Sequence, residues 1–144
     1  MKKCKDVMTQ NPVCCLPTDT VSKAAQLMKD ENVGSIPVIE DVQTMKLIGI
    51  VTDRDLALQV LAPERNAGFT QVEDVMTYEV ITCRASDDVQ KALDAMAQHQ
   101  LRRMPVIDAD HRIVGIISQA DVATRVEKSE EVAEMVKEIS QPTA

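Results

Sequence analysis

Apolar positions along the chain change their spacing in the same order twice. Two stretches have the spacing of an amphipathic helix, with apolar side chains at Val21, Ala24, Ala25 and Met28 and again at Val89, Ala92, Leu93 and Met96. Helix start signals stand just before them, at 17–19 and 85–87. Each helix is followed by a pair of short apolar runs typical of buried strands, at 36–39 and 47–51 and again at 104–107 and 113–117. With extended segments at 12–16 and 80–84 and a second helix after each pair of runs, the pattern predicts two β-α-β-β-α units.

The two units are copies of one another. Asp6-Val7-Met8-Thr9 recurs as Asp74-Val75-Met76-Thr77, and at the same offset Pro37-Val38-Ile39 recurs as Pro105-Val106-Ile107. The offset shortens by two residues after the polar loop 40–46, where an insertion is tolerated. A unit of about 60 residues buries so little surface that it is only marginally stable on its own. We therefore predict an α/β (α+β) fold in which two pseudo-twofold-related repeats pack through their sheets.

This duplication sets the predicted boundaries along the chain. They are repeat 1 at 1–61, a linker at 62–73, repeat 2 at 74–127, and a C-terminal amphipathic helix with its tail at 128–144. The apolar face of that last helix consists of Val132, Met135, Val136 and Ile139. It packs either on its own chain or on a partner chain, and the sequence leaves both open.

One motif occurs in both copies, at 49–55 and at 115–121. Each is a glycine, two β-branched apolar residues, a hydroxyl residue, and an aspartate three positions later: Thr52 with Asp55, and Ser118 with Asp121. One interpretation is a capping box at a strand-to-helix junction. The other is a ligand site, where the hydroxyl meets a phosphate and the aspartate accepts hydrogen bonds from ribose hydroxyls. A single copy favours the cap, and two copies in matching contexts strengthen the ligand interpretation.

Composition narrows the classes of partner. The apolar fraction is 44% but aromatic residues make up only 1%, so the core is aliphatic and the stacking platforms of single-strand binders are missing. A net charge of −7 argues against nucleic acid and anionic membranes, although Arg102-Arg103 could still attract a small anion. No apolar run is long enough to span a bilayer, and no apolar signal region follows the basic first residues. We place the protein in the cytoplasm.

The four cysteines form no C-x-x-C pair, and the two histidines lie far from them in sequence. We expect Cys4, Cys14, Cys15 and Cys83 to be buried or half-buried reduced thiols rather than a redox bridge or a metal site. Cys15 and Cys83 occupy equivalent positions of the two repeats, which leaves open that folding brings them together.

The paired motifs identify a family resemblance. Val7-Met8-Thr9, Ile36-Pro37-Val38-Ile39 and 49–55, with their second copies Val75-Met76-Thr77, 103–107 and 115–121, closely resemble a pair of CBS (cystathionine β-synthase) domains, the Bateman module. The resemblance covers residues 1–127 and leaves no catalytic domain over. The chain thus looks like a stand-alone bacterial two-CBS protein, and among these it is similar to the mycobacterial hypoxic response type.

The resemblance implies a regulatory adenosyl ligand, AMP, ADP, ATP or S-adenosylmethionine, bound in clefts built from both copies, with no cofactor required. Its motif positions imply one cleft made of Asp121 for ribose, Ser118 and Arg103 for phosphate, Ile116 beside the base, and Thr9, Val13, Val33 and Gly34 from repeat 1. They imply a second cleft made of Asp55 for ribose, Thr52 and Arg54 for phosphate, Ile50 beside the base, and Thr77, Ile81, Leu101 and Arg102 from repeat 2.

The two clefts differ in charge. Repeat 2 has Gln119-Ala120 where repeat 1 has Asp53-Arg54, and repeat 1 has Ser35 in place of Arg103. We slightly favour the Asp55 cleft because Arg54 lies on the same turn as the ribose acceptor. Asp53 adds repulsion there, which disfavours a ligand of high phosphate charge.

The sequence therefore predicts a non-catalytic ligand sensor that signals by a conformational or oligomeric change. It has no nucleophile–base pair, Walker loop or histidine pair at metal spacing, which argues against an enzyme. The alternative is a structural or redox interaction protein without a ligand, in which thiol alkylation would matter and the aspartates would not. The family implies a homodimer and an unidentified effector, and the apolar faces at Leu56, Val60, Val122 and Val126 suit either a dimer or a monomer core.

Overall fold

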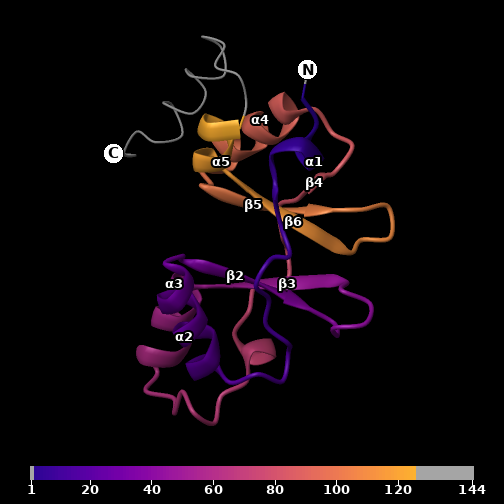
Figure 1. Cartoon of the computed structure of the whole chain (residues 1–144). Coiled ribbons are helices and arrows are strands. Elements are labelled where there is room, and N and C mark those ends of the chain that lie inside the picture. Colours follow the sequence, from indigo (N-terminus) through magenta and orange to yellow (C-terminus); the bar gives the residue numbers. More distant parts are fainter. Residues whose placement is uncertain (1, 126–144) are drawn as a thin grey trace. The chain divides into compact units, whose positions relative to one another are not determined.

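The computed structural model of the chain describes residues 2–125 and divides the chain into two compact units (Figure 1). Unit 1 consists of Met1–Pro12 and Ile81–Ala144, and unit 2 consists of Val13–Val80. The units therefore do not follow the sequence repeats, because the first residues of repeat 1 belong to the unit that holds repeat 2. The predicted C-terminal helix at 128–144, and Val126, lie outside the described residues.

Unit 2 is a two-layer arrangement of helices on one face of a small sheet (Figure 1). Its elements are α2 (Val21–Glu31), β2 (Ser35–Ile39), β3 (Leu47–Thr52), α3 (Asp53–Leu56), a π-helical turn η1 (Ala57–Leu61) and a 3-10 turn η2 (Val72–Asp74). β2 and β3 form an antiparallel hairpin. A parallel bridge from Cys15 to Val38 and an antiparallel bridge from Thr77 to Ile50 extend the sheet on its two sides.

Unit 1 has the same arrangement, but short strands, and not single bridges, flank its hairpin on both sides. Its elements are α1 (Cys4–Val7), β1 (Thr9–Gln10), β4 (Cys83–Arg84), α4 (Val89–His99), β5 (Arg103–Ile107), β6 (Ile113–Ser118) and α5 (Gln119–Arg125). The strand order is β1-β6-β5-β4, in which β4 is parallel to β5 and the other pairs are antiparallel. Equivalent bulges occur after Val38 and after Val106. The mixed α/β class and the duplication are confirmed.

The helices predicted after the start signals at 17–19 and 85–87 begin at Val21 and at Val89. Before each of them, Asp19 and Asp87 accept hydrogen bonds from the backbone N–H groups of Leu16 and Arg84, both at 2.8 Å, and so form a local turn. Thr20 caps α2, accepting from the Lys23 N–H at 3.2 Å.

The sequence pattern did not predict two short segments, which we name strap 1 (residues 3–9) and strap 2 (residues 71–77). Each strap begins with a backbone hydrogen bond to the turn before the longest helix of its unit. Cys4 N bonds to Asp87 O before α4, and Val72 N bonds to Asp19 O before α2, both at 2.8 Å. Each ends beside the last strand of that unit, where Thr9 pairs with Ile116 and Thr77 with Ile50. The straps are therefore equivalent elements in the two units.

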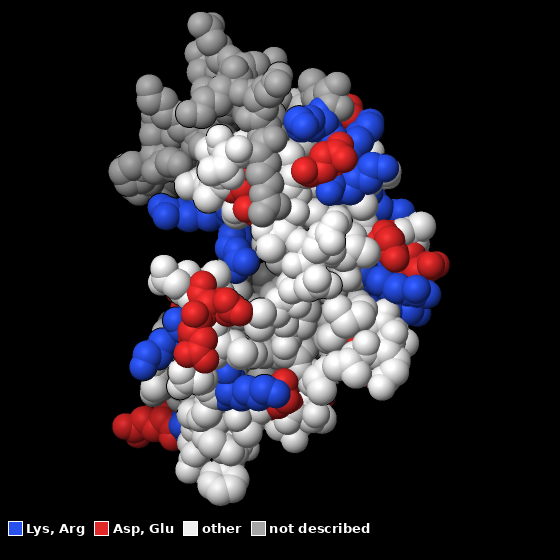
Figure 2. Space-filling model, viewed as in Figure 1, with Lys and Arg blue, Asp and Glu red and all other residues white. Residues whose placement is uncertain are grey.

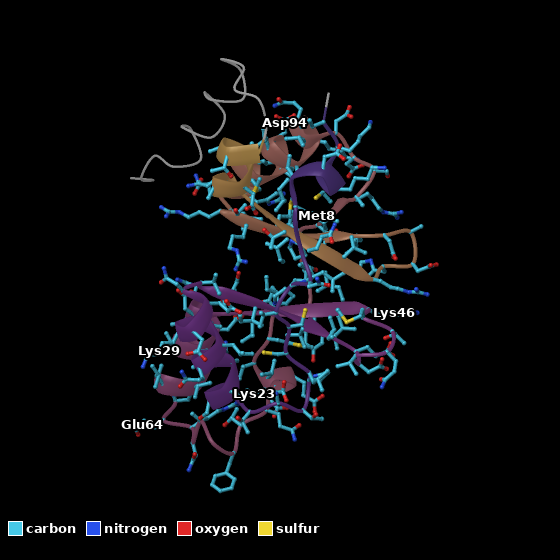
Figure 3. All side chains as sticks on the ribbon, viewed as in Figure 1. Met8, Lys23, Lys29, Lys46, Glu64 and Asp94 are labelled. Carbon is cyan, nitrogen blue, oxygen red and sulfur yellow. The ribbon has the colours of Figure 1, made fainter. Side chains whose placement is uncertain are left out.

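Each unit has its own aliphatic core. In unit 1, Leu93, Met96, Met104 and Ile117 are fully buried together, and the half-buried Met8, labelled in Figure 3, packs against them. In unit 2 the core contains Ile36, Val38, Val51 and Val72. Val60 and Val122 are buried and Leu56 packs on the unit 2 core, so these predicted helix faces are core positions of their own units.

Gly115 is required where strap 1 crosses β6. A Cβ atom at this position would lie 2.9 Å from the Thr9 carbonyl oxygen and 2.6 Å from the Met8 sulfur. We expect Gly115→Ala to lower the free energy of unfolding by about 1–3 kcal/mol, since the strap backbone must move away. Urea unfolding measures this. In Gly68→Ala, where the nearest heavy atom is the Asn66 side-chain oxygen at 3.3 Å, the change should stay within about 0.5 kcal/mol. Equal losses in the two variants would contradict the crossing.

Candidate functional site

The predicted residues Thr52, Asp55 and Thr77 meet at the junction of β3 and α3. Thr77 Oγ1 donates to Asp55, at 3.2 Å from each carboxylate oxygen. Thr52 Oγ1 accepts from the Asp55 N–H at 3.0 Å, while the Thr52 N–H donates to Asp55 Oδ2 at 3.0 Å. The capping box is therefore present, and the same carboxylate also binds a hydroxyl from strap 2. The two interpretations of the motif do not exclude each other.

Strand geometry explains why Ile50 lies beside this group. Side chains of β3 alternate between buried and half-buried positions, so Ile50 and Thr52 share the half-buried face while Val51 is in the core. The strap is fixed to the same place by two backbone hydrogen bonds between Ile50 and Thr77, of 2.9 and 2.8 Å. We call Ile50, Thr52, Arg54, Asp55 and Thr77 the unit 2 half-site.

Arg54 and Asp53 are exposed at the start of α3. The Asp53 N–H donates to the Gly34 carbonyl at 2.9 Å, and Asp53 Oδ1 accepts from the Arg54 N–H at 2.8 Å. The Asp53 carboxylate covers Gly34 so closely that a Cβ atom there would lie 2.9 Å from Asp53 Oδ2. A negative charge therefore stands next to the half-site, as the sequence predicted.

Unit 1 holds an equivalent group at the junction of β6 and α5. Thr9 Oγ1 donates to Asp121 Oδ2 at 3.2 Å, and the Asp121 N–H donates to Ser118 Oγ at 3.1 Å. Ile116, paired with Thr9 across the sheet, is 6% exposed, so its side chain is more deeply buried than that of the half-buried Ile50. We call Thr9, Arg103, Ile116, Ser118 and Asp121 the unit 1 half-site.

Gln119, which the sequence did not single out as a site residue, lies next to the unit 1 half-site at the position that Asp53 has in unit 2. Its N–H donates to the Arg102 carbonyl at 3.1 Å, as Asp53 does to Gly34. Among the described residues, Gln119 Oε1 is buried without a hydrogen-bond partner. Such an acceptor is rare in folded proteins. The sequence alone could not single out Gln119, because a glutamine at a helix start does not indicate a buried acceptor without a partner.

The remaining predicted site residues do not belong to the unit that contains the aspartate of their predicted site. Val13, Val33 and Gly34 belong to unit 2, whereas Ile81, Leu101 and Arg102 belong to unit 1. Their part in the ligand sites stays a prediction. Each unit by itself brings together the aspartate, the hydroxyl of the cap and the threonine of the strap.

The cysteines are free thiols; Cys4, Cys15 and Cys83 are buried and Cys14 is half-buried, as expected. Burial raises the pKa values of Cys14 and Cys15 to about 11. Within residues 2–125, no group of three or more histidine, cysteine or acidic side chains is placed to hold a metal ion.

Two features are relevant to possible partners: the charges on the surface, and the length and apolar character of the helices. Acidic and basic side chains are interspersed over the face shown in Figure 2. In the part of the chain that the structure describes, no helix has both the length and the apolar character that a membrane crossing requires.

Known proteins are similar in sequence to this chain over nearly its whole length. The chain is 38% identical over 140 residues to the CBS domain-containing protein YhcV of Bacillus subtilis, covering 97% of this chain and 96% of that protein. It is 31% identical over 144 residues to Hypoxic response protein 1 of Mycobacterium tuberculosis, covering 100% of this chain and 98% of that protein.

Solved structures show the same fold. That of Hypoxic Response Protein I, with two coordinated zinc ions, matches with a TM-score of 0.77 at 31% identity, over 88% of this chain and 100% of that one. The CBS domain pair of protein MJ0100, in complex with 5-methylthioadenosine and S-adenosyl-L-methionine, matches with a TM-score of 0.71 at 27% identity, over 85% and 94%. CBSX2 in complex with AMP matches with a TM-score of 0.72 at 28% identity, over 95% and 99%.

The sequence model of the CBS domain matches this chain twice, over residues 4–61 and 72–128. The first match overlaps the first copy of the internal repeat, and the second match overlaps the second copy. The chain therefore belongs to the CBS-domain family and carries two CBS domains.

Proposed function

We propose that this protein is a non-catalytic regulatory module that binds an adenosyl ligand. The observation that carries the proposal is the Thr–Asp pair of each half-site, Thr77 with Asp55 and Thr9 with Asp121. The resemblance had assigned these residues to one ligand site each, although they lie far apart in sequence. Similar structures in complex with AMP and with S-adenosyl-L-methionine support the ligand class.

The half-sites offer suitable chemistry for a nucleoside. A carboxylate has about four acceptor positions, so Asp55 can bind the Thr77 hydroxyl and the vicinal hydroxyls of a ribose together. Arg54 and the hydroxyl of Thr52 suit a phosphate near a helix start. Ile50 gives the adenine ring an aliphatic neighbour. In the unit 1 half-site, Arg103 and Ser118 take the phosphate role.

The complete site, in this proposal, joins each half-site to residues of the other unit. Val13, Val33 and Gly34 complete the Asp121 site, and Ile81, Leu101 and Arg102 complete the Asp55 site. The ligand binds one of two states of the module more tightly than the other, and its binding therefore shifts the module toward that state. The protein acts as a cytoplasmic homodimer, and an effector protein recognises which of the two states the dimer adopts.

A thermal-shift titration of the reduced protein tests the proposal. Native-state binding raises the melting temperature, and a ligand at about 100 times its Kd adds about 2.7 kcal/mol of stability. We expect a concentration-dependent rise with at least one of AMP, ADP, ATP and S-adenosylmethionine, in the presence of a metal chelator, and a much smaller one with GTP. Absence of any rise at millimolar ligand would reject the proposal.

A further inference from the structure

Two thiols from distant parts of the sequence meet in the core of unit 1. Strap 1 runs antiparallel to the turn before α4, with hydrogen bonds from Cys4 N to Asp87 O at 2.8 Å and from Lys5 N to Ala85 O at 3.0 Å. This pairing places Cys4 against Cys83 of β4 within one apolar cluster, where they are 0% and 5% exposed. The two side chains interact, and each changes the pKa of the other. The Cys4 S–H also donates to the Asp88 carbonyl oxygen, at 3.9 Å, and the Cys83 S–H to the Pro105 carbonyl oxygen, at 4.0 Å.

Unit 2 provides an internal comparison, because its backbone has the same arrangement without the second thiol. Val72 N bonds to Asp19 O at 2.8 Å and Glu73 N to Pro17 O at 3.0 Å, as Cys4 and Lys5 do in unit 1. Val72 occupies the position of Cys4, and Cys15 occupies that of Cys83 in the same core cluster. Among the described residues, unit 1 therefore has two cysteine sulfurs at this position, whereas unit 2 has one cysteine and a valine.

The interaction between the two side chains makes the thiols unequal. It lowers the pKa of Cys4, whereas the same interaction and burial raise the pKa of Cys83. A thiolate is the nucleophilic form of cysteine, so Cys4 is the reactive partner and Cys83 retains a proton. Cys14 and Cys15, with pKa values of about 11, are poor nucleophiles by comparison.

We propose that Cys4 and Cys83 form a redox-active dithiol that hydrogen peroxide oxidises to a disulfide, fastening strap 1 to β4. The Cys4 thiolate attacks one peroxide oxygen and the O–O bond breaks, giving a Cys4 sulfenic acid and a hydroxide that takes up a proton to become water. The Cys83 sulfur then attacks the Cys4 sulfur, the S–O bond breaks, and the second water leaves with the Cys83 proton. Two thiols and one peroxide thus give one disulfide and two waters.

Strap 1 is suited to give peroxide access to the buried pair. Its helix α1 is four residues long, and the neighbouring Lys2, Lys3 and Lys5 are exposed. Short elements of this kind open locally at a lower free energy than the core does. Because Thr9 lies on the same strap, oxidation also restrains the Thr9–Asp121 pair, a consequence for ligand binding that rests on the proposed function.

Peptide mapping of the full-length protein tests the pairing. The reduced protein is treated with one equivalent of hydrogen peroxide, the remaining thiols are alkylated in denaturant, and tryptic peptides are identified by mass spectrometry. We expect peptide 4–5 to be cross-linked to peptide 66–84, and peptide 6–23, which contains Cys14 and Cys15, to be alkylated twice. A cross-link between 6–23 and 66–84, or free alkylated Cys4 and Cys83 after peroxide, would overturn the proposal.

Two variants and a matched control add a readout that does not depend on peptides. Cys4→Val copies the side chain that unit 2 has at this position, Cys83→Ser keeps a hydrogen-bonding group, and Cys15→Ala removes the equivalent lone thiol. Oxidation should raise the melting temperature of the wild type and of Cys15→Ala, reversibly with dithiothreitol, and should leave both pair variants unchanged. Amide exchange should slow in strap 1 and not in strap 2. A rise that persists in Cys4→Val, or equal slowing in both straps, would contradict the pair.

Discussion

Asp55→Asn and Asp121→Asn should each lower the affinity of one site for the adenosyl ligand about 10- to 100-fold. Asparagine keeps one acceptor oxygen for the cap but loses the second acceptor and the charge that the ribose hydroxyls bind. One charge-assisted hydrogen bond contributes about 1.5–3 kcal/mol, and about 1.4 kcal/mol corresponds to a factor of ten. Isothermal titration calorimetry on each variant, and on the double variant, measures the loss site by site.

Asp53→Asn is the matched control for Asp55→Asn. It removes the same charge two residues earlier, from a carboxylate that lies against Gly34. Because Asp53 repels a phosphate, its removal should leave AMP affinity unchanged or raise it. Equal losses in the Asp53 and Asp55 variants would show that the effect is one of charge or folding, not of contact with the ribose.

The largest effect on stability is expected for Leu93→Ala. Leu93 is fully buried in unit 1, where it packs with Met96, Met104 and Ile117. Truncating a buried leucine removes apolar burial and leaves a cavity, at a cost of about 2–5 kcal/mol. That is a large part of the total stability of a domain, about 5–15 kcal/mol. The midpoint of urea unfolding should therefore fall strongly.

Leu58→Ala is the control for this prediction. Leu58 is 50% exposed on η1, so its truncation should change the free energy of unfolding far less. Similar losses in the two variants would mean that Leu93 is not part of a packed core.

The periodic elements could be predicted from the sequence because their information is local. Helical spacing at Val21 and Val89, and the apolar runs that became β3 and β6, indicated their structures directly. The junction motif was also local: Thr52 caps α3 as its spacing to Asp55 predicted. The turn that Asp19 forms before α2, by accepting from the Leu16 N–H, was not indicated by the sequence pattern.

The straps could not be predicted from the sequence pattern. β1 has two residues and α1 has four, too few for any period to be recognised. Their positions depend on pairing with residues that are distant in sequence: Thr9 bonds to Asp121, 112 positions away, and Thr77 to Asp55, 22 positions away. The family resemblance, and not the pattern, supplied Thr9 and Thr77 as site residues.

The cysteines show what internal repetition does and does not reveal. Cys15 and Cys83 occupy equivalent positions, and the structure confirms the equivalence: each is paired in parallel with the corresponding valine, Val38 or Val106. Equivalent positions of a repeat, however, lie in different units. The partner of Cys83 is Cys4, whose own equivalent is Val72, and no spacing rule links them.

A crystal structure of the protein with AMP would test nucleotide binding at the half-sites most directly. We expect AMP at one or both half-sites, with its ribose hydroxyls donating to Asp55 or Asp121 and the adjoining Thr77 or Thr9 still bonded to the same carboxylate. AMP bound elsewhere, or a saturating concentration of AMP that leaves both carboxylates in contact with their threonines alone, would contradict it.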